Sequence, residues 1–218
     1  MLGSGFWMNV SIIKIVPVPI IQYPAPSNHY PVSSIQYPVS SNNLNTIAML
    51  TKSLQKILNE QVAKEAYSSV LYLAMASWAE VNGFPGVAQW LYVQSDEERI
   101  HMLKFIKYIN ERGGVAIVPE LKKPPVEYKT VKDLFIMVLK HEEYISRSIN
   151  EIVGTCVEEK DFTTNSWIQF FVNEQIEEEA SAKSILDKLH LVGENNMYLF
   201  DRDILAMRAA SRRNETGN

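Results

Sequence analysis

Apolar residues recur with heptad-like spacing from residue 50 to about residue 192, and no alternation of the β type persists over that range. Glycine is sparse there, so the spacing predicts long α-helices rather than strands. We expect four long helices and a shorter fifth: near 50–80, from Pro85 to Gly113, from Thr130 to Cys156, from Asp161–Thr164 to Gly193, and near 197–211. The predicted fold class is therefore all-α.

The connections between these helices predict the topology. Only a few residues link the first helix to the second and the third to the fourth, so each pair is antiparallel. The link over about residues 113–129 is longer and holds Pro119, Pro124 and Pro125. Extended, it spans up to ~55 Å, whereas a helix of about 29 residues is ~43 Å long. We expect it to cross the bundle, giving an up-down-down-up four-helix bundle with one long crossover.

The apolar seam of every long helix is interrupted near its middle by polar residues. These residues are Glu65 in the first helix, Glu98 and His101 in the second, Glu142 in the third, and Gln175 and Glu178 in the fourth. Helix midpoints superpose whichever way each helix runs. We therefore expect four carboxylates, one imidazole and one amide to meet in one layer of the core.

Such a layer predicts a metal site. Buried carboxylates are rare unless they are paired or metal-bound, and four together repel one another and raise their pKa values. No Lys or Arg occupies the central seam positions, whereas two divalent cations would neutralise the charge. Oxygen-rich sites with one imidazole suit iron, manganese or zinc. A single seam glutamate is usually exposed, and a single histidine usually hydrogen-bonded in the core, but the joint pattern on four helices favours metal.

Charge and proline divide the chain near residue 48. The first 48 residues hold one charged side chain, Lys14, and six of the ten prolines, and residues 22–42 repeat QYPAPSN, HYPVSSI, QYPVSSN with a period of seven. Proline at that density blocks helix and central strand, so we expect an extended or disordered extension over 1–48. It is a native tail, a consequence of a start codon assigned too early (Met49 being the first residue), or a cloning artefact. Residues 49–218 form the second predicted region.

The remaining composition excludes some functions. A net charge of −4 gives no reason to expect nucleic acid or a membrane surface as partner. One cysteine, Cys156, excludes an internal disulfide framework and suits a reducing compartment, so we expect a cytoplasmic protein. The sequence contains no run of 18 apolar residues, so no membrane span is expected.

Four stretches resemble bacterial non-haem ferritins: LNEQVAKEAYSSVLY (58–72), DEERIHM (96–102), KHEEYI (140–145) and NEQIEEEASAKSILDKL (173–189). The resemblance covers about residues 49–207. It implies a ferritin-like bundle with a short fifth helix and a homo-oligomeric 24-subunit hollow shell. It also implies a ferroxidase that oxidises Fe²⁺ with O₂ or H₂O₂ and stores ferric mineral inside. One departure is Gln-x-x-Glu in the fourth helix, where the general di-metal bundle pattern has Glu-x-x-His.

The same resemblance assigns roles to single residues. One iron would be held by Glu65, Glu98 and His101, and the second by Glu98, Glu142 and Glu178, with Glu98 bridging the two irons. A third iron site would use four acids: Glu97, Glu174, Glu177 and the shared Glu178.

Four other positions refine this assignment. Gln175 would lie near the oxygen-binding face, and Tyr72 beside the di-iron centre. Arg99 stands where haem-binding bacterioferritins carry methionine, so no haem is expected. His141 precedes Glu142, and we interpret it as a surface histidine rather than a residue that supports the centre.

Two other functions fit parts of the same pattern. A di-iron oxidase or peroxidase would use the same layer but retain its metals and store nothing. A metal-free scaffold bundle would gain no stability from iron.

Overall fold

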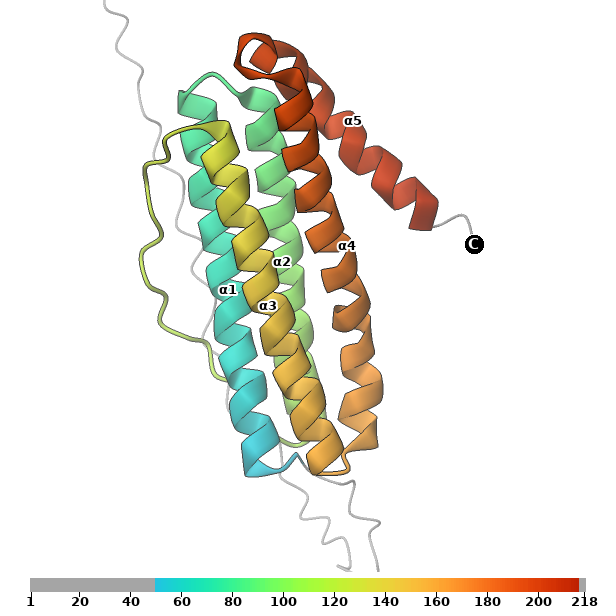
Figure 1. Ribbon diagram of the computed structural model, residues 1–218. Helices are drawn as coiled ribbons and strands as arrows, with labels where there is room; N and C mark the ends of the chain where they lie inside the picture. Colours follow the sequence, from blue (N-terminus) through green and yellow to red (C-terminus); the bar gives the residue numbers. More distant parts are fainter. Residues whose placement is uncertain (1–49, 216–218) are drawn as a thin grey trace, which may run out of the picture. The chain divides into compact units, whose positions relative to one another are not determined.

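A computed structural model of the chain describes residues 50–215 (Figure 1). The predictions for residues 1–48 lie outside this range. The helices are α1 (Lys52–Val81), α2 (Pro85–Glu111), α3 (Val131–Glu158), α4 (Phe162–Val192), a short 3₁₀ helix η1 (Glu194–Asn196), and α5 (Met197–Glu215). The described part of the chain contains no strand, and the predicted all-α fold is confirmed.

The long connection between α2 and α3 makes these two helices parallel. It runs along the outside of the bundle beside α1, so that α1–α2 and α3–α4 are two antiparallel pairs (Figure 1). Asn59 of α1 fixes the connection by accepting from the Ile117 N–H at 2.7 Å and donating to the Val115 carbonyl at 3.0 Å. The up-down-down-up bundle predicted from connection lengths is confirmed.

Side chains predicted to begin helices α3 and α4 do so. Thr130 accepts from the backbone N–H of Asp133 at 3.0 Å and donates to its carboxylate at 2.9 Å. Asp161 accepts from the backbone N–H of Thr164 at 2.9 Å. Each cap satisfies a backbone donor that has no partner within its own helix, which fixes where the helix begins.

Two apolar clusters fill the bundle, one on either side of its middle. One cluster includes Tyr72, Met75 and Trp90 and extends to Phe200 of α5. The other includes Leu54, Phe105 and Ile152. On every long helix, the predicted polar positions fall between the residues of the two clusters. The core is therefore divided by a polar layer, as the sequence predicts.

Helix α5 is attached to the beginning of α2 by one carboxylate. Asp201 accepts from the backbone N–H of Gly86 at 3.1 Å and from that of Val87 at 2.9 Å. These N–H groups belong to the first turn of α2, where a negative charge is favourable. A Cβ atom on Gly86 would lie 1.8 Å from the Asp201 carbonyl oxygen. Only glycine allows the two backbones to approach this closely.

None of the helices within residues 50–215 combines the length and the apolar composition that a membrane crossing requires.

Gly86→Ala should therefore destabilise the protein and detach α5. The added methyl group forces the two backbones apart and removes the Asp201 cap, which should lower the free energy of unfolding by about 1–3 kcal/mol. Hydrogen exchange should become faster in α5. Gly154→Ala in α3 is the matched control, because its Cβ would meet nothing within 4 Å. It should stabilise by about 0.5–1 kcal/mol. Equal unfolding temperatures for the two variants would contradict this account.

Candidate metal centre

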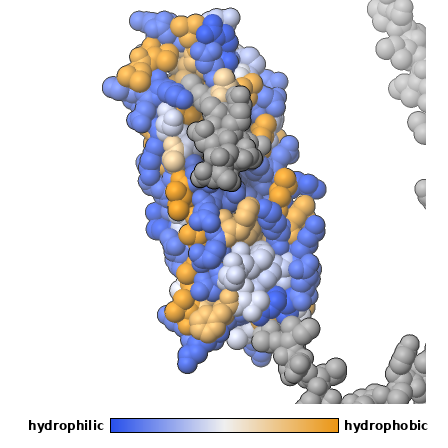
Figure 2. Space-filling model, turned by 90° about the vertical axis from the view of Figure 1, so that its right-hand side faces the viewer, coloured by the Kyte–Doolittle hydropathy of each residue, from blue (hydrophilic) through white to orange (hydrophobic). Residues whose placement is uncertain are grey.

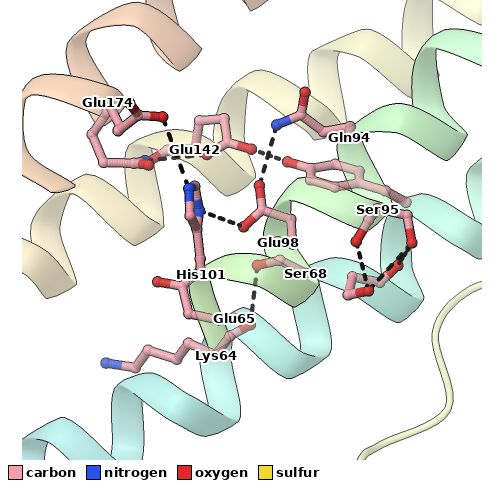
Figure 3. Close-up of polar contacts among 12 residues, drawn as sticks. Lys64, Glu65, Ser68, Gln94, Ser95, Glu98, His101, Glu142 and Glu174 are labelled. Carbon is pink, nitrogen blue, oxygen red and sulfur yellow. Dashed lines mark hydrogen bonds and ion pairs between the residues drawn. The ribbon is translucent and has the colours of Figure 1, made fainter. Parts of the chain in front are cut away.

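The predicted polar side chains come from all four long helices. Figure 3 labels four of them, Glu65, Glu98, His101 and Glu142. Five of these side chains are buried, namely Glu65, Glu98, His101, Glu142 and Gln175. Glu178 is partly buried. The structure thus places these side chains at one depth of the bundle, between the two apolar clusters.

Glu65, Glu98 and His101 form the tightest group. Each offers one ligand atom, and these atoms all lie within 4.8 Å of one another. His101 Nδ1 lies 3.6 Å from Glu98 Oε2. Among the described residues, Glu65 Oε2 is the only buried side-chain N or O atom that lacks a hydrogen-bond partner. A buried oxygen without a partner is costly, and a bound cation would satisfy it.

Glu142 lies on the α3 side of the layer and is held from two directions. The Tyr72 hydroxyl donates to its Oε1. The Gln175 amide donates to its Oε2 at 3.1 Å and to its backbone carbonyl at 3.2 Å. Tyr72 and Gln175 therefore orient a carboxylate of the layer, and both are themselves buried.

The acids assigned to a third iron site occupy the edge of this layer. Glu174 is partly buried, and its Oε2 lies 3.8 Å from His101 Nε2. Glu97 is also partly buried, whereas Glu177 is exposed. By ligand distances, the described group that could hold an ion consists of Glu65, Glu98 and His101. The ligand roles of this group stay a prediction, as do those of the other assigned residues, Glu97, Glu142, Glu174, Gln175, Glu177 and Glu178.

Burial and repulsion disfavour the charged carboxylates in the metal-free layer. The pKa of Glu65 is raised well above its usual value, first by burial and then by the Glu98 charge. Burial also raises the pKa values of Glu98, Glu142 and Glu178, and lowers that of His101.

Among the described residues, no buried Lys or Arg lies in this layer. Within the described part of the chain, the buried residues include one Lys or Arg, namely Arg112. Its guanidinium lies 3.1 Å from the carboxylate of Asp161, which is the N-cap of α4. The layer is therefore a group of buried carboxylates without a buried Lys or Arg beside them, which suits a cationic ligand.

Two glutamines that the sequence analysis did not assign determine which carboxylate oxygens are free. Gln61 lies one helical turn before Glu65, and Gln94 lies one turn before Glu98. Gln61 donates to Glu65 Oε1 at 2.7 Å, and Gln94 donates to Glu98 Oε1 at 3.2 Å. The Oε2 atom of each glutamate is left for other partners. The repeated Gln-x-x-x-Glu spacing in two helices is a signal that could have identified both glutamines.

Gln61 is itself fixed by a chain of contacts from α3. The Ser148 hydroxyl donates to Gln61 Oε1 at 2.5 Å, and the Lys64 ammonium lies 2.5 Å from Ser148 Oγ. The orientation of Glu65 thus depends on two helices.

His141 differs from its interpretation as a surface residue. It is partly buried, its Nε2 lies 2.7 Å from Ser68 Oγ, and its ring meets the Tyr72 ring edge-on at 5.8 Å. Burial lowers its pKa to about 4, so the imidazole is neutral at pH 7. His141 lies outside the apolar seam of α3 in the sequence pattern, but aromatic side chains of α1 cover it in the structure.

Comparisons with known proteins agree with this fold. Residues 55–192 match the Ferritin family, described as a ferritin-like domain. A probable bacterial non-heme ferritin-like protein of Haemophilus influenzae is 42% identical over 158 residues, covering 72% of this chain and 96% of the relative. A bacterial non-heme ferritin of Campylobacter jejuni is 40% identical, covering 72% and 95%. The chain belongs to the ferritin family.

Solved structures support the same assignment. An open pore ferritin from the archaeon Archaeoglobus fulgidus superposes with a TM-score of 0.70 at 37% identity, covering 72% of this chain and 97% of that chain. The resemblance inferred from the four sequence stretches is confirmed.

Glu65→Gln should change how stability depends on pH. The pKa of Glu65 is raised above its usual 4.5 in the folded state, so the folded protein binds more protons than the unfolded chain. Metal-free wild type should therefore lose stability as pH rises above about 4.5. The variant keeps the shape of the side chain without the charge, so its thermal stability should exceed that of wild type more at about pH 8 than at about pH 5.

The control for this experiment is Glu151→Gln, which removes a carboxylate charge from an exposed position of α3. It should leave the pH dependence unchanged. Added Co²⁺ should raise the unfolding temperature of wild type and of Glu151→Gln, and should raise that of Glu65→Gln much less. Parallel pH profiles for wild type and Glu65→Gln would show that Glu65 does not carry the buried charge.

Proposed function

We propose that this ferritin stores iron by oxidising Fe²⁺ at the mid-bundle centre and depositing ferric mineral inside a shell of 24 copies. The observation that carries the proposal is the uncompensated group of buried carboxylates around His101. Two Fe²⁺ ions bring as much positive charge as the four seam glutamates bring negative charge. Iron is the substrate and cargo here, and family membership supports iron over other divalent metals.

The ligand assignment is the one that the family resemblance implies, and the grouping of Glu65, Glu98 and His101 supports its first half. Glu65 Oε2 and the Oε2 of Glu98 are the oxygens that the two glutamines leave free, and His101 supplies a ring nitrogen. These three groups would hold one Fe²⁺. Glu98, Glu142 and Glu178 would hold the other, with Glu142 oriented by Tyr72 and Gln175.

The oxidation needs two irons close together. Each Fe²⁺ gives up one electron, so an adjacent pair delivers two electrons to one oxidant. With O₂ the products are two Fe³⁺ and, after uptake of two protons, H₂O₂. With H₂O₂ the same two electrons and two protons give two molecules of water. Carboxylates with raised pKa values release their protons when metal binds, which places a proton source beside the oxidant.

Storage requires the oxidised iron to leave the centre. On the α4 side, Gln175 is a neutral amide that donates to Glu142 and offers no negative charge to Fe³⁺. Beyond it, Glu97, Glu174 and Glu177 would receive the product on its way to the cavity. An enzyme that keeps its metals would instead be expected to have a charged ligand in place of Gln175.

Exposed apolar side chains support assembly into a larger particle. Val81, Val118 and Leu191 are each more than four-fifths exposed in the isolated chain, at 86%, 81% and 82%. Hydrophobic patches interrupt the mainly hydrophilic face seen in Figure 2. Where such side chains gather into large contiguous patches, they mark contacts with other chains. In a homo-oligomer these contacts would be copies of the same chain.

The alternative, a di-iron oxidase or peroxidase that retains its metals, is not favoured. The relatives from Haemophilus and Campylobacter carry ferritin names. A metal-free scaffold is also not favoured, because it gives no reason for the buried Glu65 Oε2 without a partner.

A variant with both Glu98→Ala and His101→Ala should lose rapid Fe²⁺ oxidation. The change removes the bridging carboxylate and the imidazole, so the initial rate should fall by at least ~100-fold, since changes outside the ligand shell alone cost up to that much. The rate is followed by near-ultraviolet absorbance after aerobic Fe²⁺ addition. Glu151→Ala on the surface of α3 is the control and should oxidise iron like wild type. Wild-type oxidation rates in the double variant would contradict the assignment of Glu98 and His101 as iron ligands.

A further inference from the structure

A hollow of about 330 Å³ lies between α3 and α4, beside the polar layer. These two helices are packed against each other as an antiparallel pair (Figure 1). Gln175 lines the hollow and is 8% exposed. Its amide donates to Glu142 Oε2 at 3.1 Å and to the Ser146 hydroxyl at 3.4 Å. A single side chain, that of Gln175, therefore separates the hollow from a carboxylate of the layer.

The charges around the hollow are already paired. Among the described residues that line it, the charged ones are Glu179 and Lys183, and the Lys183 ammonium lies 3.0 Å from Glu179 Oε2. The other oxygen of Glu179 accepts from the Ser146 hydroxyl at 2.7 Å. Four apolar side chains complete much of the wall: Ile149, Val172, Ile176 and Ala180. The hollow therefore suits a small uncharged molecule better than a metal ion.

We propose that O₂ reaches the metal centre through this hollow and past Gln175. The proposal rests on the proposed function for the use of O₂, and it goes beyond that function by naming the entrance. Because O₂ is apolar and uncharged, apolar walls favour its transfer out of water. A cation entering the same hollow would lose its hydration without meeting a charge that is free to compensate it.

Gln175 is suited to the inner end of such a passage because it is neutral and has two alternative acceptors. The Ser146 hydroxyl can accept from the Gln175 amide while it donates to Glu179, since a hydroxyl oxygen carries two lone pairs. A small rotation toward Ser146 would move the amide away from Glu142 without leaving it unsatisfied. Such a rotation would cost little free energy, because one hydrogen bond replaces another.

A second hollow, of about 350 Å³ between α1 and α3, is less suited to this role. Its lining includes Lys64 and His141. The His141 ring meets the Tyr72 ring edge-on, and Tyr72 in turn donates to Glu142. Two aromatic side chains therefore separate this hollow from the carboxylate, whereas one amide separates the α3–α4 hollow from it. The α1–α3 hollow serves as the matched control.

The test measures Fe²⁺ oxidation by the full-length protein over a series of O₂ concentrations. Ala180→Phe places a ring in the α3–α4 hollow, and Ala63→Phe places one in the α1–α3 hollow. At low O₂, Ala180→Phe should lower the oxidation rate by about tenfold, which corresponds to ~1.4 kcal/mol of added barrier. The deficit should shrink as O₂ rises, because access limits only the step that uses O₂. Ala63→Phe should follow wild type at every O₂ concentration.

Two further measurements separate access from damage to the centre. Ile176→Trp enlarges a side chain that is 65% exposed at the same hollow, and it should behave like Ala180→Phe. Anaerobic calorimetry with Co²⁺ alone should give the same affinity for wild type and all three variants. A merely structural effect would lower Co²⁺ affinity and would not disappear at high O₂.

The route is wrong if Ala180→Phe and Ile176→Trp both oxidise Fe²⁺ like Ala63→Phe at every O₂ concentration. It is also wrong if their rates fall only as far as their Co²⁺ affinities do. A changed particle size with wild-type rates would assign the hollow to a contact between copies of the chain. Failure of the proposed function is distinct, because wild type itself would then oxidise Fe²⁺ no faster than buffer.

Discussion

The burial of several carboxylates at the middle of one bundle is the constraint on which the rest of the structure depends. Each such group costs free energy by leaving water, and each raises the cost of its neighbours by repulsion. The pKa values of Glu65, Glu98, Glu142 and Glu178 are all raised in consequence. Binding of a cation to the carboxylates would offset this free-energy cost.

The surrounding structure holds these groups in place without neutralising them. Apolar clusters on both sides of the layer supply the stability that the layer itself does not. Gln61 and Gln94 fix one oxygen of a glutamate each, and Tyr72 and Gln175 fix both oxygens of Glu142. All four are neutral donors, so they set orientation while leaving the negative charge for metal. This combination of rigid position and uncompensated charge is what a preorganised cation site needs.

Much of the fold and the centre of the site could be predicted from the sequence. Heptad spacing gives the helices, connection lengths give the topology, and equal depth on four helices gives the polar layer, because all three depend only on positions along the chain. The contacts that could not be predicted depend on packing between distant segments. Asp201 reaches Gly86 across more than a hundred residues, and the burial of His141 depends on rings from α1. The link between His101 and Glu174 depends on which way one ring faces, which no spacing encodes.

The most direct test of the central claim is aerobic iron loading of the purified protein, followed by size-exclusion chromatography with iron analysis. The account predicts rapid oxidation and elution of far more than two irons per chain with one particle of about 600 kDa, the mass of 24 chains of 24.9 kDa. Rapid oxidation that stops at about two irons per chain on a small oligomer would keep the metal centre but contradict storage. No acceleration over buffer would contradict the metal centre itself.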